Sequence, residues 1–393
     1  DKTTVELADA LLGSIGEVSG ATLARSILDR YAVMTPNEKL AFFEFMTDKL
    51  EIDPEYVIQA LNAFKIDPNK ATYQAFAEAS EPKRQELARR LNQVPGATGQ
   101  LVKLRKDLLV MIKDRPKLGP LDVDLKHLFS SWFNRGFLVL RPINWSSPAD
   151  ILEKIIAYEA VHAIHSWDDL RLRLKPTDRR CFGFFHPSMP DEPLIFVEVA
   201  LTKGIPNSIQ ELLADERDPI NAADADTAVF YSISNCQAGL AGISFGNSLI
   251  KQVASDLATD LPGISTFVTL SPIPGLNRWL ETSKLADANL GQDKALAAHY
   301  LLKAKKPDGM PLDPVARFHL GNGAKVHAVH TQADTSENGL KQSNGTMVNY
   351  LYDLSQISQN HEKFVSDKTV VASALVKTLS TAVKTKVKEA RDG

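Results

Sequence analysis

Residues 227–269 constrain the fold most, because a strand, a glycine-rich loop, a helix and a second strand follow one another there. TAVFYSIS, at 227–234, is rich in the β-branched and aromatic residues that are typical of strands. CQAGLAGISFGN comes next, then SLIKQVASDLATDL carries apolar residues at helical spacing, and TFVTL alternates like a half-buried strand. This order predicts a strand, loop, helix and strand unit within a mixed α+β domain.

The first third of the chain is predicted to be helical. In TPNEKLAFFEFMTDKL, Thr35 is placed as an N-cap, and Glu38 three residues later completes a capping box. Asp53 opens DPEYVIQALNAF in the same way, with a proline after it. The pattern changes after HLFSSWFNRG. We therefore predict an all-helical bundle over residues 1–128 and a mixed α/β domain over residues 129–393.

Further strands are predicted in the second part of the chain. RCFGFFHP and PLIFVEVALT flank the turn SMPDE and are expected to form a hairpin, while AKVHAVHTQAD and TMVNYLYDL are expected as later strands. Glu198 interrupts the apolar run LIFVEVALT. A buried acid is one interpretation, but an edge-strand or partner-facing carboxylate is the preferred one.

Composition excludes several classes of protein. A net charge of -3 over 393 residues disfavours a nucleic-acid partner, which needs clustered Lys and Arg. No apolar run of 18 residues exists, so no membrane-spanning helix is expected, and DKTTVELADALLG lacks the features of a secretory leader. Cys181 and Cys236 are too few for a disulfide framework or a multi-cysteine metal site. A reducing, cytoplasmic compartment is expected.

The glycine-rich loop is the first candidate for binding chemistry. Gly239, Gly242 and Gly246 lie between a strand and a helix start, where backbone N–H groups can face an anion such as a pyrophosphate. The alternative is that these glycines only turn a tight corner, because the spacing matches neither a Walker loop nor a Rossmann fingerprint. The two interpretations remain open on spacing alone.

A serine and a histidine are the next candidates. Ser271 follows the strand TFVTL directly and precedes Pro272, which restricts its backbone to extended geometry, although an ordinary strand-to-helix turn has the same pattern. His319 falls in the last turn of a helix predicted from its cap Asp313, where the helix dipole favours the protonated imidazole and a proton donor. The alternative is a structural histidine. No G-x-S-x-G elbow is present around the serine.

A metal site is not expected. His162 and His165, in AVHAIHSW, are three residues apart, but no further ligand lies near them at ligand spacing.

Taken together, several motifs resemble the malonyl-CoA decarboxylase family in sequence and in order. The resemblance covers most of the chain from about Trp132. It implies a helical N-terminal domain followed by a catalytic domain with a GNAT-like fold, the fold of acyl-CoA-dependent N-acetyltransferases. The motifs are FYSIS (230–234), GLAGISFGNSLIK (239–251), LSPIPG (270–275), FHLGNGA (318–324) and MVNYLY (347–352).

The resemblance also implies an activity and a site. The reaction is decarboxylation of malonyl-CoA to acetyl-CoA and carbon dioxide, without a cofactor, and Ser271 and His319 carry over as the catalytic dyad. Three residues carry over as the supporting pocket: Ser232, Tyr352 and Ser244. The loop that receives CoA comprises Gly239, Leu240, Ala241, Gly242 and Gly246.

This sequence departs from part of the family at Ser244, because some members, animal enzymes among them, have a glutamate at that position. Ser244 also replaces a glycine of the acetyltransferase loop pattern.

The remaining expectations concern the oligomeric state and two alternative functions. The resemblance implies a homo-oligomer, specifically a tetramer, with the helical region as its assembly surface, in malonate or fatty-acid metabolism. An acyl-CoA-dependent N-acyltransferase on the same fold is one alternative, and it would release free CoA. A noncatalytic malonyl-CoA sensor is another, and it would bind the thioester without consuming it.

Overall fold

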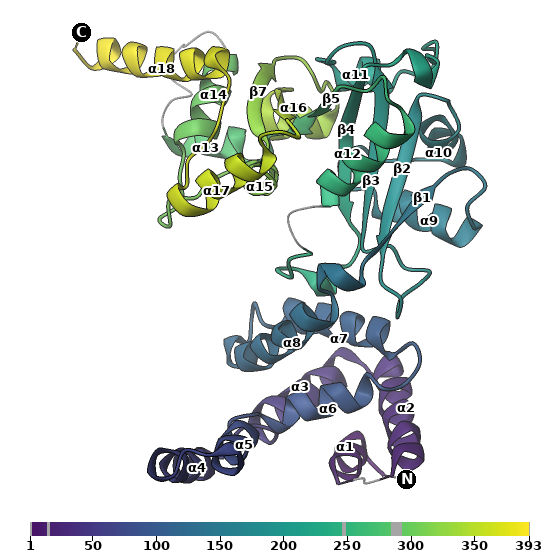
Figure 1. Ribbon diagram of the computed structural model, residues 1–393, viewed down its shortest axis with the longest axis vertical. Helices are drawn as coiled ribbons and strands as arrows, with labels where there is room; N and C mark the ends of the chain where they lie inside the picture. Colours follow the sequence, from purple (N-terminus) through teal and green to yellow (C-terminus); the bar gives the residue numbers. More distant parts are fainter. Residues whose placement is uncertain (1, 14–15, 246–248, 284–292, 393) are drawn as a thin grey trace. The chain divides into compact units, whose positions relative to one another are not determined.

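The computed structural model describes residues 2–13, 16–245, 249–283 and 293–392 (Figure 1). The chain divides into two compact units. The first comprises residues 1–139, 185–192 and 237–245, and the second comprises residues 140–184, 193–236 and 246–393.

The first unit is helical, as the sequence predicts. Thr35 accepts a hydrogen bond from the Glu38 N–H and Glu38 bonds back to the Thr35 N–H, so the predicted capping box is confirmed, as is the Asp53 cap. Its helices are α1 (Thr4–Leu12), α2 (Glu17–Val33), α3 (Pro36–Asp48), α4 (Pro54–Ile66), α5 (Lys70–Ala79), α6 (Lys83–Leu91), α7 (Ala97–Met111) and α8 (Gly119–Trp132), with the 3-10 turns Pro116–Leu118, Arg135–Phe137 and Ala238–Leu240.

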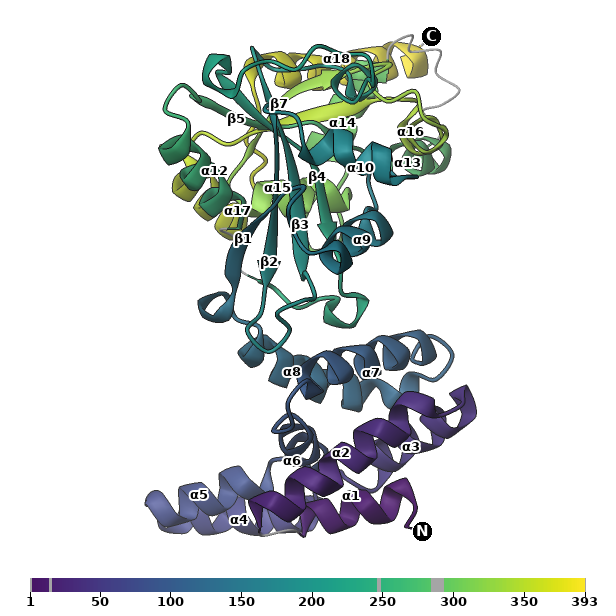
Figure 2. The ribbon, with the colours of Figure 1, turned by 90° about the vertical axis from the view of Figure 1, so that its right-hand side faces the viewer.

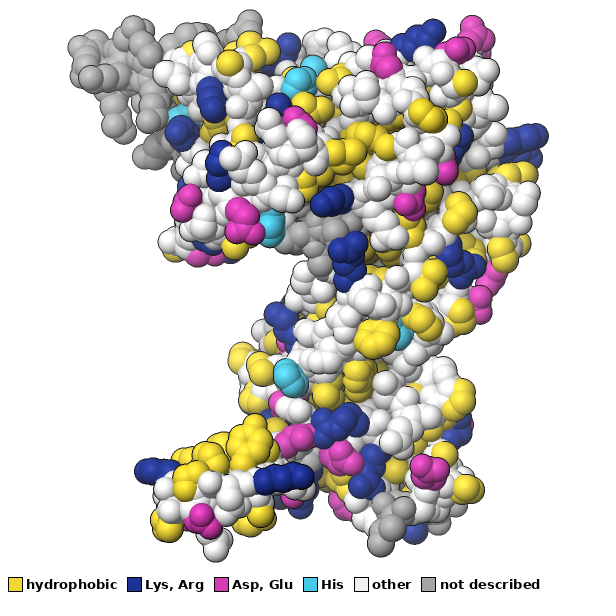
Figure 3. Space-filling view, in the orientation of Figure 1, with side chains coloured by type: hydrophobic (Ala, Val, Ile, Leu, Met, Phe, Trp, Pro, Cys, Tyr) yellow, Lys and Arg dark blue, Asp and Glu magenta, His cyan; other side chains and the backbone are white. Residues whose placement is uncertain are grey.

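Helices α4 and α5 form a hairpin with little buried surface of its own. Only Ala60 of α4 and Ala79 of α5 are buried among the described residues of the two helices. Ile58, Leu61 and Tyr73 are exposed apolar side chains on this hairpin. Figure 3 shows hydrophobic side chains gathered over it.

The second unit is built on a mixed sheet of eight described strands. The order is β1-β2-β3-β4-β5-β8-β6, with β7 on the other edge of β8. The predicted hairpin is the antiparallel pair β2 and β3, and α12 joins the parallel pair β4 and β5. The strands are β1 (Val139–Ile143), β2 (Arg179–Phe185), β3 (Ile195–Thr202), β4 (Thr227–Asn235), β5 (Thr266–Thr269), β6 (Ser271–Pro272), β7 (Lys325–His330) and β8 (Met347–Leu351).

Helices cover both faces of this sheet. Figure 2 shows α12 on one face and α9 and α10 on the other. The described part of the chain contains no helix that is long and apolar enough to cross a membrane. The helices are α9 (Ala149–Tyr158), α10 (Trp167–Leu174), α11 (Ile209–Leu212), α12 (Leu249–Asp260), α13 (Leu276–Ser283), α14 (Asp293–Lys303), α15 (Pro314–Gly321), α16 (Glu337–Ser343), α17 (Ile357–Asp367) and α18 (Ala374–Asp392), with a 3-10 turn at Ala222–Asp224.

Two irregularities open the centre of the sheet. Glu198 pairs with Ser232 and Val199 pairs with Phe230, so Tyr231 is the extra residue of a β-bulge in β4. The parallel pairing of β4 with β5 then ends at Thr269.

The strand that contains TFVTL does not end before Ser271, however. The chain continues as β6, which pairs with β8 in the same register as β5 does. Val268 pairs with Leu351, and Ser271 pairs with Val348. Ser271 therefore lies just beyond the point where β4 and its neighbour stop pairing.

Candidate active site

A cavity of about 220 Å³ lies at this opening of the sheet. Ile233 and Asn235 line it from β4, Ser271 lines it from β6, and Phe318 and His319 line it from α15. The predicted helix around the histidine is confirmed: Asp313 is its N-cap, Pro314 starts it, and it ends at Gly321. Strand, turn and helix thus bring two residues that are 48 positions apart in sequence to one cavity.

Ser271, His319 and Tyr352 form a buried hydrogen-bonded series. The Ser271 Oγ lies 3.3 Å from His319 Nε2, and His319 Nδ1 lies 2.7 Å from the Tyr352 hydroxyl. The three residues are 5%, 3% and 2% exposed, respectively. Tyr352 therefore contacts the imidazole on the side opposite the serine, where an orienting group is needed.

The imidazole of His319 is neutral in this setting. Burial lowers its pKa to about 3, because no water solvates the charged form. Desolvation therefore outweighs the helix dipole, contrary to the expectation of a protonated histidine. Burial also raises the pKa of Tyr352 well above its ordinary value, so the phenol keeps its proton and donates it to Nδ1. The hydrogen of the neutral ring then sits on Nε2, facing Ser271.

Thr269 is a further member of this series that sequence reasoning missed. The Ser271 hydroxyl donates to Thr269 Oγ1 at 2.8 Å, and the Tyr350 N–H donates to the same oxygen at 3.0 Å. The sequence does contain a signal, since positions i and i+2 of a strand present their side chains to the same face. Thr269 holds the serine hydroxyl in one direction.

Ser232 does not line this cavity in the described structure. Its hydroxyl lies 2.8 Å from both carboxylate oxygens of Glu159, which follows α9. Glu159 Oε1 also accepts the N–H groups of Val161 at 2.7 Å and His162 at 2.8 Å. Val161 lines the cavity, so Ser232 reaches the site through Glu159 and the loop that it fixes. Sequence reasoning did not find Glu159.

Glu198 is a buried acid, and the preferred interpretation as an edge-strand or partner-facing carboxylate was wrong. It lies on β3, between β2 and β4, and is 0% exposed. Burial raises its pKa well above the ordinary range, and the Arg173 guanidinium lies 3.3 Å from its Oε2.

The glycine-rich loop belongs to the first compact unit. Leu240 is buried, whereas Gly242 and Ser244 are exposed. Gly246, the last residue of the predicted CoA-binding loop, lies outside the described residues.

At two positions of this loop the structure requires glycine for a clear physical reason. A Cβ at Gly239 would lie 1.9 Å from the carbonyl oxygen of Val102 in α7, so no side chain fits there. Gly242 has φ +74° and follows Ala241 at φ -54°, ψ 131°, while the Ile243 N–H donates to Leu240 O at 3.0 Å. This is a type II turn, which needs glycine at its third position.

Arg105 of α7 ties the loop to the helices. Its Nη1 donates to Gly239 O at 2.7 Å and to Ala241 O at 3.0 Å, and its Nε donates to Asp122 Oδ1 at 2.8 Å. The arginine is 1% exposed, so its charge is satisfied entirely by these oxygens and the carboxylate.

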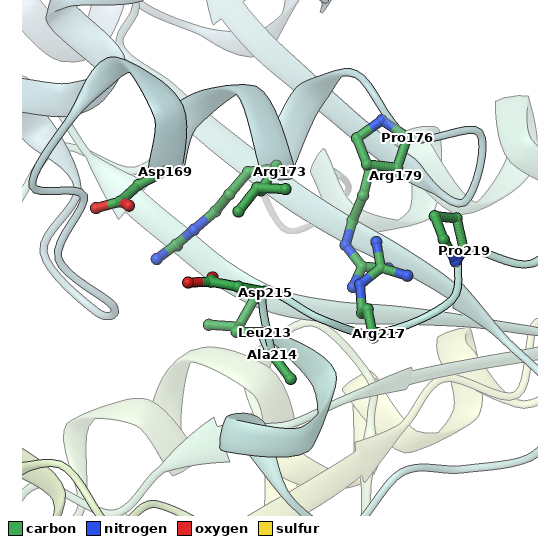
Figure 4. Close-up of a pocket in the computed structure, with 10 residues that line it drawn as sticks. Asp169, Arg173, Pro176, Arg179, Leu213, Ala214, Asp215, Arg217 and Pro219 are labelled. Atoms are coloured by element: carbon green, nitrogen blue, oxygen red, sulfur yellow. The ribbon is translucent and has the colours of Figure 1, made fainter.

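A second, smaller cavity of about 90 Å³ is lined by arginines (Figure 4). Arg217 binds both oxygens of Asp178, at 2.6 and 2.9 Å, and Arg179 donates to the backbone oxygen of Leu212 at 2.5 Å. The guanidinium groups are thus engaged by neighbouring oxygens, and this cavity is an ion-pair network of the second unit.

The described residues contain no group of three or more His, Cys, Asp or Glu side chains that could hold a metal ion.

Two models of one protein family match this chain. The family model described as the malonyl-CoA decarboxylase C-terminal domain matches residues 136–295 and 290–392, and the model of the N-terminal domain matches residues 50–133. The chain belongs to the malonyl-CoA decarboxylase family.

Curated relatives agree with this family. The mitochondrial malonyl-CoA decarboxylase of Anser anser anser is 36% identical over 349 residues, which are 75% of this chain and 69% of the relative. The enzyme of Rattus norvegicus is 34% identical over 353 residues, which are 76% of this chain and 71% of the relative. The chain is therefore an enzyme of the malonyl-CoA decarboxylase family.

Solved structures of malonyl-CoA decarboxylases agree as well. That from Rhodopseudomonas palustris matches with a TM-score of 0.91 and 48% identity, covering 95% of this chain and 98% of that one. The structure from Agrobacterium vitis matches with a TM-score of 0.90 and 46% identity, covering 96% of this chain and 99% of that one. These likenesses and the described elements confirm the predicted all-helical N-terminal region followed by a mixed α/β domain.

Proposed function

We propose that this chain decarboxylates malonyl-CoA to acetyl-CoA and carbon dioxide, and that Ser271 and His319 carry out the chemistry. The observation that supports the proposal is the hydroxyl and imidazole pair, 3.3 Å apart, in a cavity whose other lining includes Ile233 and Phe318. Family membership supports the substrate.

The reaction itself demands little beyond positioning. The bond between the methylene carbon and the malonyl carboxylate breaks, carbon dioxide leaves, and the electron pair moves into the thioester as an enolate. The enolate carbon then takes one proton to give acetyl-CoA. We propose that no prosthetic group takes part, because the thioester carbonyl is itself the electron sink. The protein must orient the carboxylate and stabilise the enolate oxygen.

Ser271 is proposed to stabilise that oxygen. Its hydroxyl donates to Thr269 Oγ1, and a rotation about the side-chain bond would turn the same O–H toward the thioester oxygen of a bound substrate. Thr269 loses only a neutral hydrogen bond in this exchange. The gain is larger, because a hydrogen bond to a developing anion is stronger than one between neutral groups.

His319 is proposed to supply the proton. Burial keeps its imidazole neutral, but a bound malonyl carboxylate would bring a negative charge beside it, which raises the pKa of the imidazole. The imidazole takes up a proton on Nδ1, and the Tyr352 hydroxyl turns to accept it. The Nε2 proton then passes to the Ser271 oxygen as the Ser271 proton passes to the enolate carbon, and the ring is left neutral with its hydrogen on Nδ1. Tyr352 holds the ring in the necessary orientation through its 2.7 Å hydrogen bond.

Assembly and location are part of the proposal. We infer a homotetramer whose subunits meet through the helical region, since the α4 and α5 hairpin exposes apolar side chains. We also propose a cytoplasmic enzyme of malonate or fatty-acid metabolism, and the low cysteine content, two in 393 residues, supports a reducing compartment.

The decisive experiment is a product balance. The purified chain, treated with a chelator, is incubated with malonyl-CoA while acetyl-CoA and carbon dioxide are followed together. Equimolar formation of both supports the proposal. Release of free CoA to an amine would support an acyltransferase instead, and intact malonyl-CoA with measurable binding would support a sensor.

Variants then test the dyad. Ser271→Ala and His319→Asn are each expected to lower turnover by about 10²–10⁴-fold while CoA binding survives, because the donor and the proton source are lost. Ser265→Ala and His127→Asn, at exposed positions, serve as matched controls. Near wild-type turnover in both dyad variants would refute the assignment.

A further inference from the structure

A row of polar side chains crosses the sheet of the second unit. Cys181 of β2 pairs with Glu198 of β3, and Glu198 pairs with Ser232 of β4, so the three side chains lie on one face. Arg173 of α10 and Glu159, which follows α9, contact this row. The row therefore lies on the face that α9 and α10 cover (Figure 2), with Glu198 in its middle.

Glu198 contacts both side chains that hold the loop between α9 and α10. Its Oε2 lies 3.3 Å from Nη1 of Arg173, and Nη2 of the same guanidinium donates to Ala163 O of the loop at 3.3 Å. The Glu198 carboxyl is also hydrogen-bonded to the carboxylate of Glu159, which accepts two N–H groups of the loop. The buried acid thus connects the donor and the acceptor that fix this loop.

A hydrogen bond between two carboxyl groups requires a proton on one of them. Glu159 has other donors, because the Ser232 hydroxyl and two backbone N–H groups bond to it. Glu198 Oε1 is buried and accepts from no N–H or hydroxyl group of the described residues. Burial and the negative charge of Glu159 both raise the pKa of Glu198, so the proton belongs on Glu198.

We propose that Glu198 is a neutral carboxylic acid that positions the loop between α9 and α10, donating to Glu159 and accepting from Arg173. The inference rests on the proposed function, because this loop places Val161 in the wall of the cavity assigned to the malonyl group. All of these residues belong to the second compact unit. Glu198 acts through the loop and does not itself line the cavity.

Two substitutions distinguish a neutral acid from a carboxylate at this position. Glu198→Gln keeps a donor for Glu159 and an acceptor for Arg173, so kcat/KM for malonyl-CoA should stay within about twofold of the wild type. Glu198→Ala removes both contacts and is expected to lower kcat/KM about tenfold, because the cavity wall is displaced. Glu216→Ala, at an exposed acid of the same unit, is the matched control.

A double variant tests whether Glu198 acts through Glu159. Once Glu159→Ala has removed the carboxylate that holds the loop, adding Glu198→Ala should cost much less activity than it does alone. Fully additive losses would contradict the positioning role, because two groups that act independently show no coupling.

Two measurements need no turnover, so they decide this inference even if the wild type does not decarboxylate malonyl-CoA. The infrared difference spectrum between the wild type and Glu198→Gln at pH 7 should contain the carbonyl band of a protonated carboxylic acid, which the variant has lost. Hydrogen exchange of the amides in residues 159–166 should be faster in Glu198→Ala and unchanged in Glu198→Gln.

The two measurements also define what would overturn the inference. A wild type without the acid band would show that Glu198 is charged. Exchange in Glu198→Gln that is clearly faster than in the wild type would show that a neutral donor cannot hold the loop. Both outcomes are read from the wild type and Glu198→Gln, so they decide even if Glu198→Ala fails to fold.

Discussion

His319 is kept neutral by burial, and this makes the free energy of unfolding depend on pH. Its pKa is about 3 in the folded chain and close to 6.5 in the unfolded chain. As the pH falls below 6.5, the unfolded chain binds a proton that the folded chain does not. Stability present above pH 6.5 is therefore lost toward pH 3, at up to about 1.4 kcal/mol per pH unit.

This prediction is checked by urea unfolding of the wild type and of His319→Gln between pH 7 and pH 4.5. The variant has no group to titrate at this position, so its free energy of unfolding should fall less steeply with decreasing pH. Asp313, whose pKa burial raises to about 6, works in the opposite direction, but it is present in both proteins and cancels in the difference. Parallel profiles would contradict the assignment of a neutral buried imidazole.

At the scale of residues, the sequence predicted the identities in the site better than their contacts. Ser271 and His319 were candidates from their local patterns, the family motifs made them a dyad, and the structure brings them together at one cavity. Tyr352 was expected only as a supporting residue of the pocket. Its hydrogen bond to His319 Nδ1 joins residues that are 33 positions apart in sequence. Ser232 was expected in the pocket, but its hydroxyl is taken by Glu159. Side-chain partners of this kind depend on three-dimensional pairing, which no local pattern encodes.

At the scale of elements, the carboxylate of Glu159 holds the start of the loop between α9 and α10. Glu159 accepts bonds from the Ser232 hydroxyl and from two loop N–H groups, and the loop carries Val161 into the cavity wall. Glu159→Ala is expected to lower kcat/KM about ten- to hundredfold, because a wall displaced by an ångström misplaces the substrate. Steady-state kinetics with malonyl-CoA measures the effect.

Two further variants sharpen that measurement. Ser232→Ala removes one donor but leaves both backbone bonds to Glu159, so its loss should be smaller. Glu153→Ala, at an exposed acid of α9, is the matched control. A Ser232→Ala variant as impaired as Ser271→Ala would show that Ser232 contacts the substrate directly, and would contradict the positioning role.

Helix starts were predictable where their signals are local. Thr35, Asp53 and Asp313 cap their helices as the sequence indicates, because a cap and its N–H partners lie within three residues of each other. The bulge at Tyr231 and the continuation of the strand through Ser271 were not predicted. Both depend on the strands that pair alongside, β3 for the bulge and β8 for the continuation.

At the scale of the whole molecule, the exposed apolar side chains of the α4 and α5 hairpin have no explanation in the packing of a single chain. Ile58 and Leu61 are 53% and 39% exposed, and their spacing of three places them on one helix face. Tyr73 on α5 is 59% exposed. Exposed apolar side chains that cluster on one hairpin, rather than scatter singly, favour a protein contact.

Replacing Ile58 and Leu61 with glutamate should therefore dissociate the proposed tetramer without unfolding the chain. Both residues are exposed within the subunit, so the substitutions remove little buried surface from the fold, whereas two charges in an apolar contact between subunits are costly. Light scattering after gel filtration should give a mass near four times 43.2 kDa for the wild type and a smaller multiple for the variant. Val18→Glu, at an apolar residue of α2 that is 84% exposed, tests whether any exposed apolar position has this effect. An unchanged mass in the double variant would place the assembly surface elsewhere, and a wild type that runs at 43.2 kDa would refute the oligomer itself.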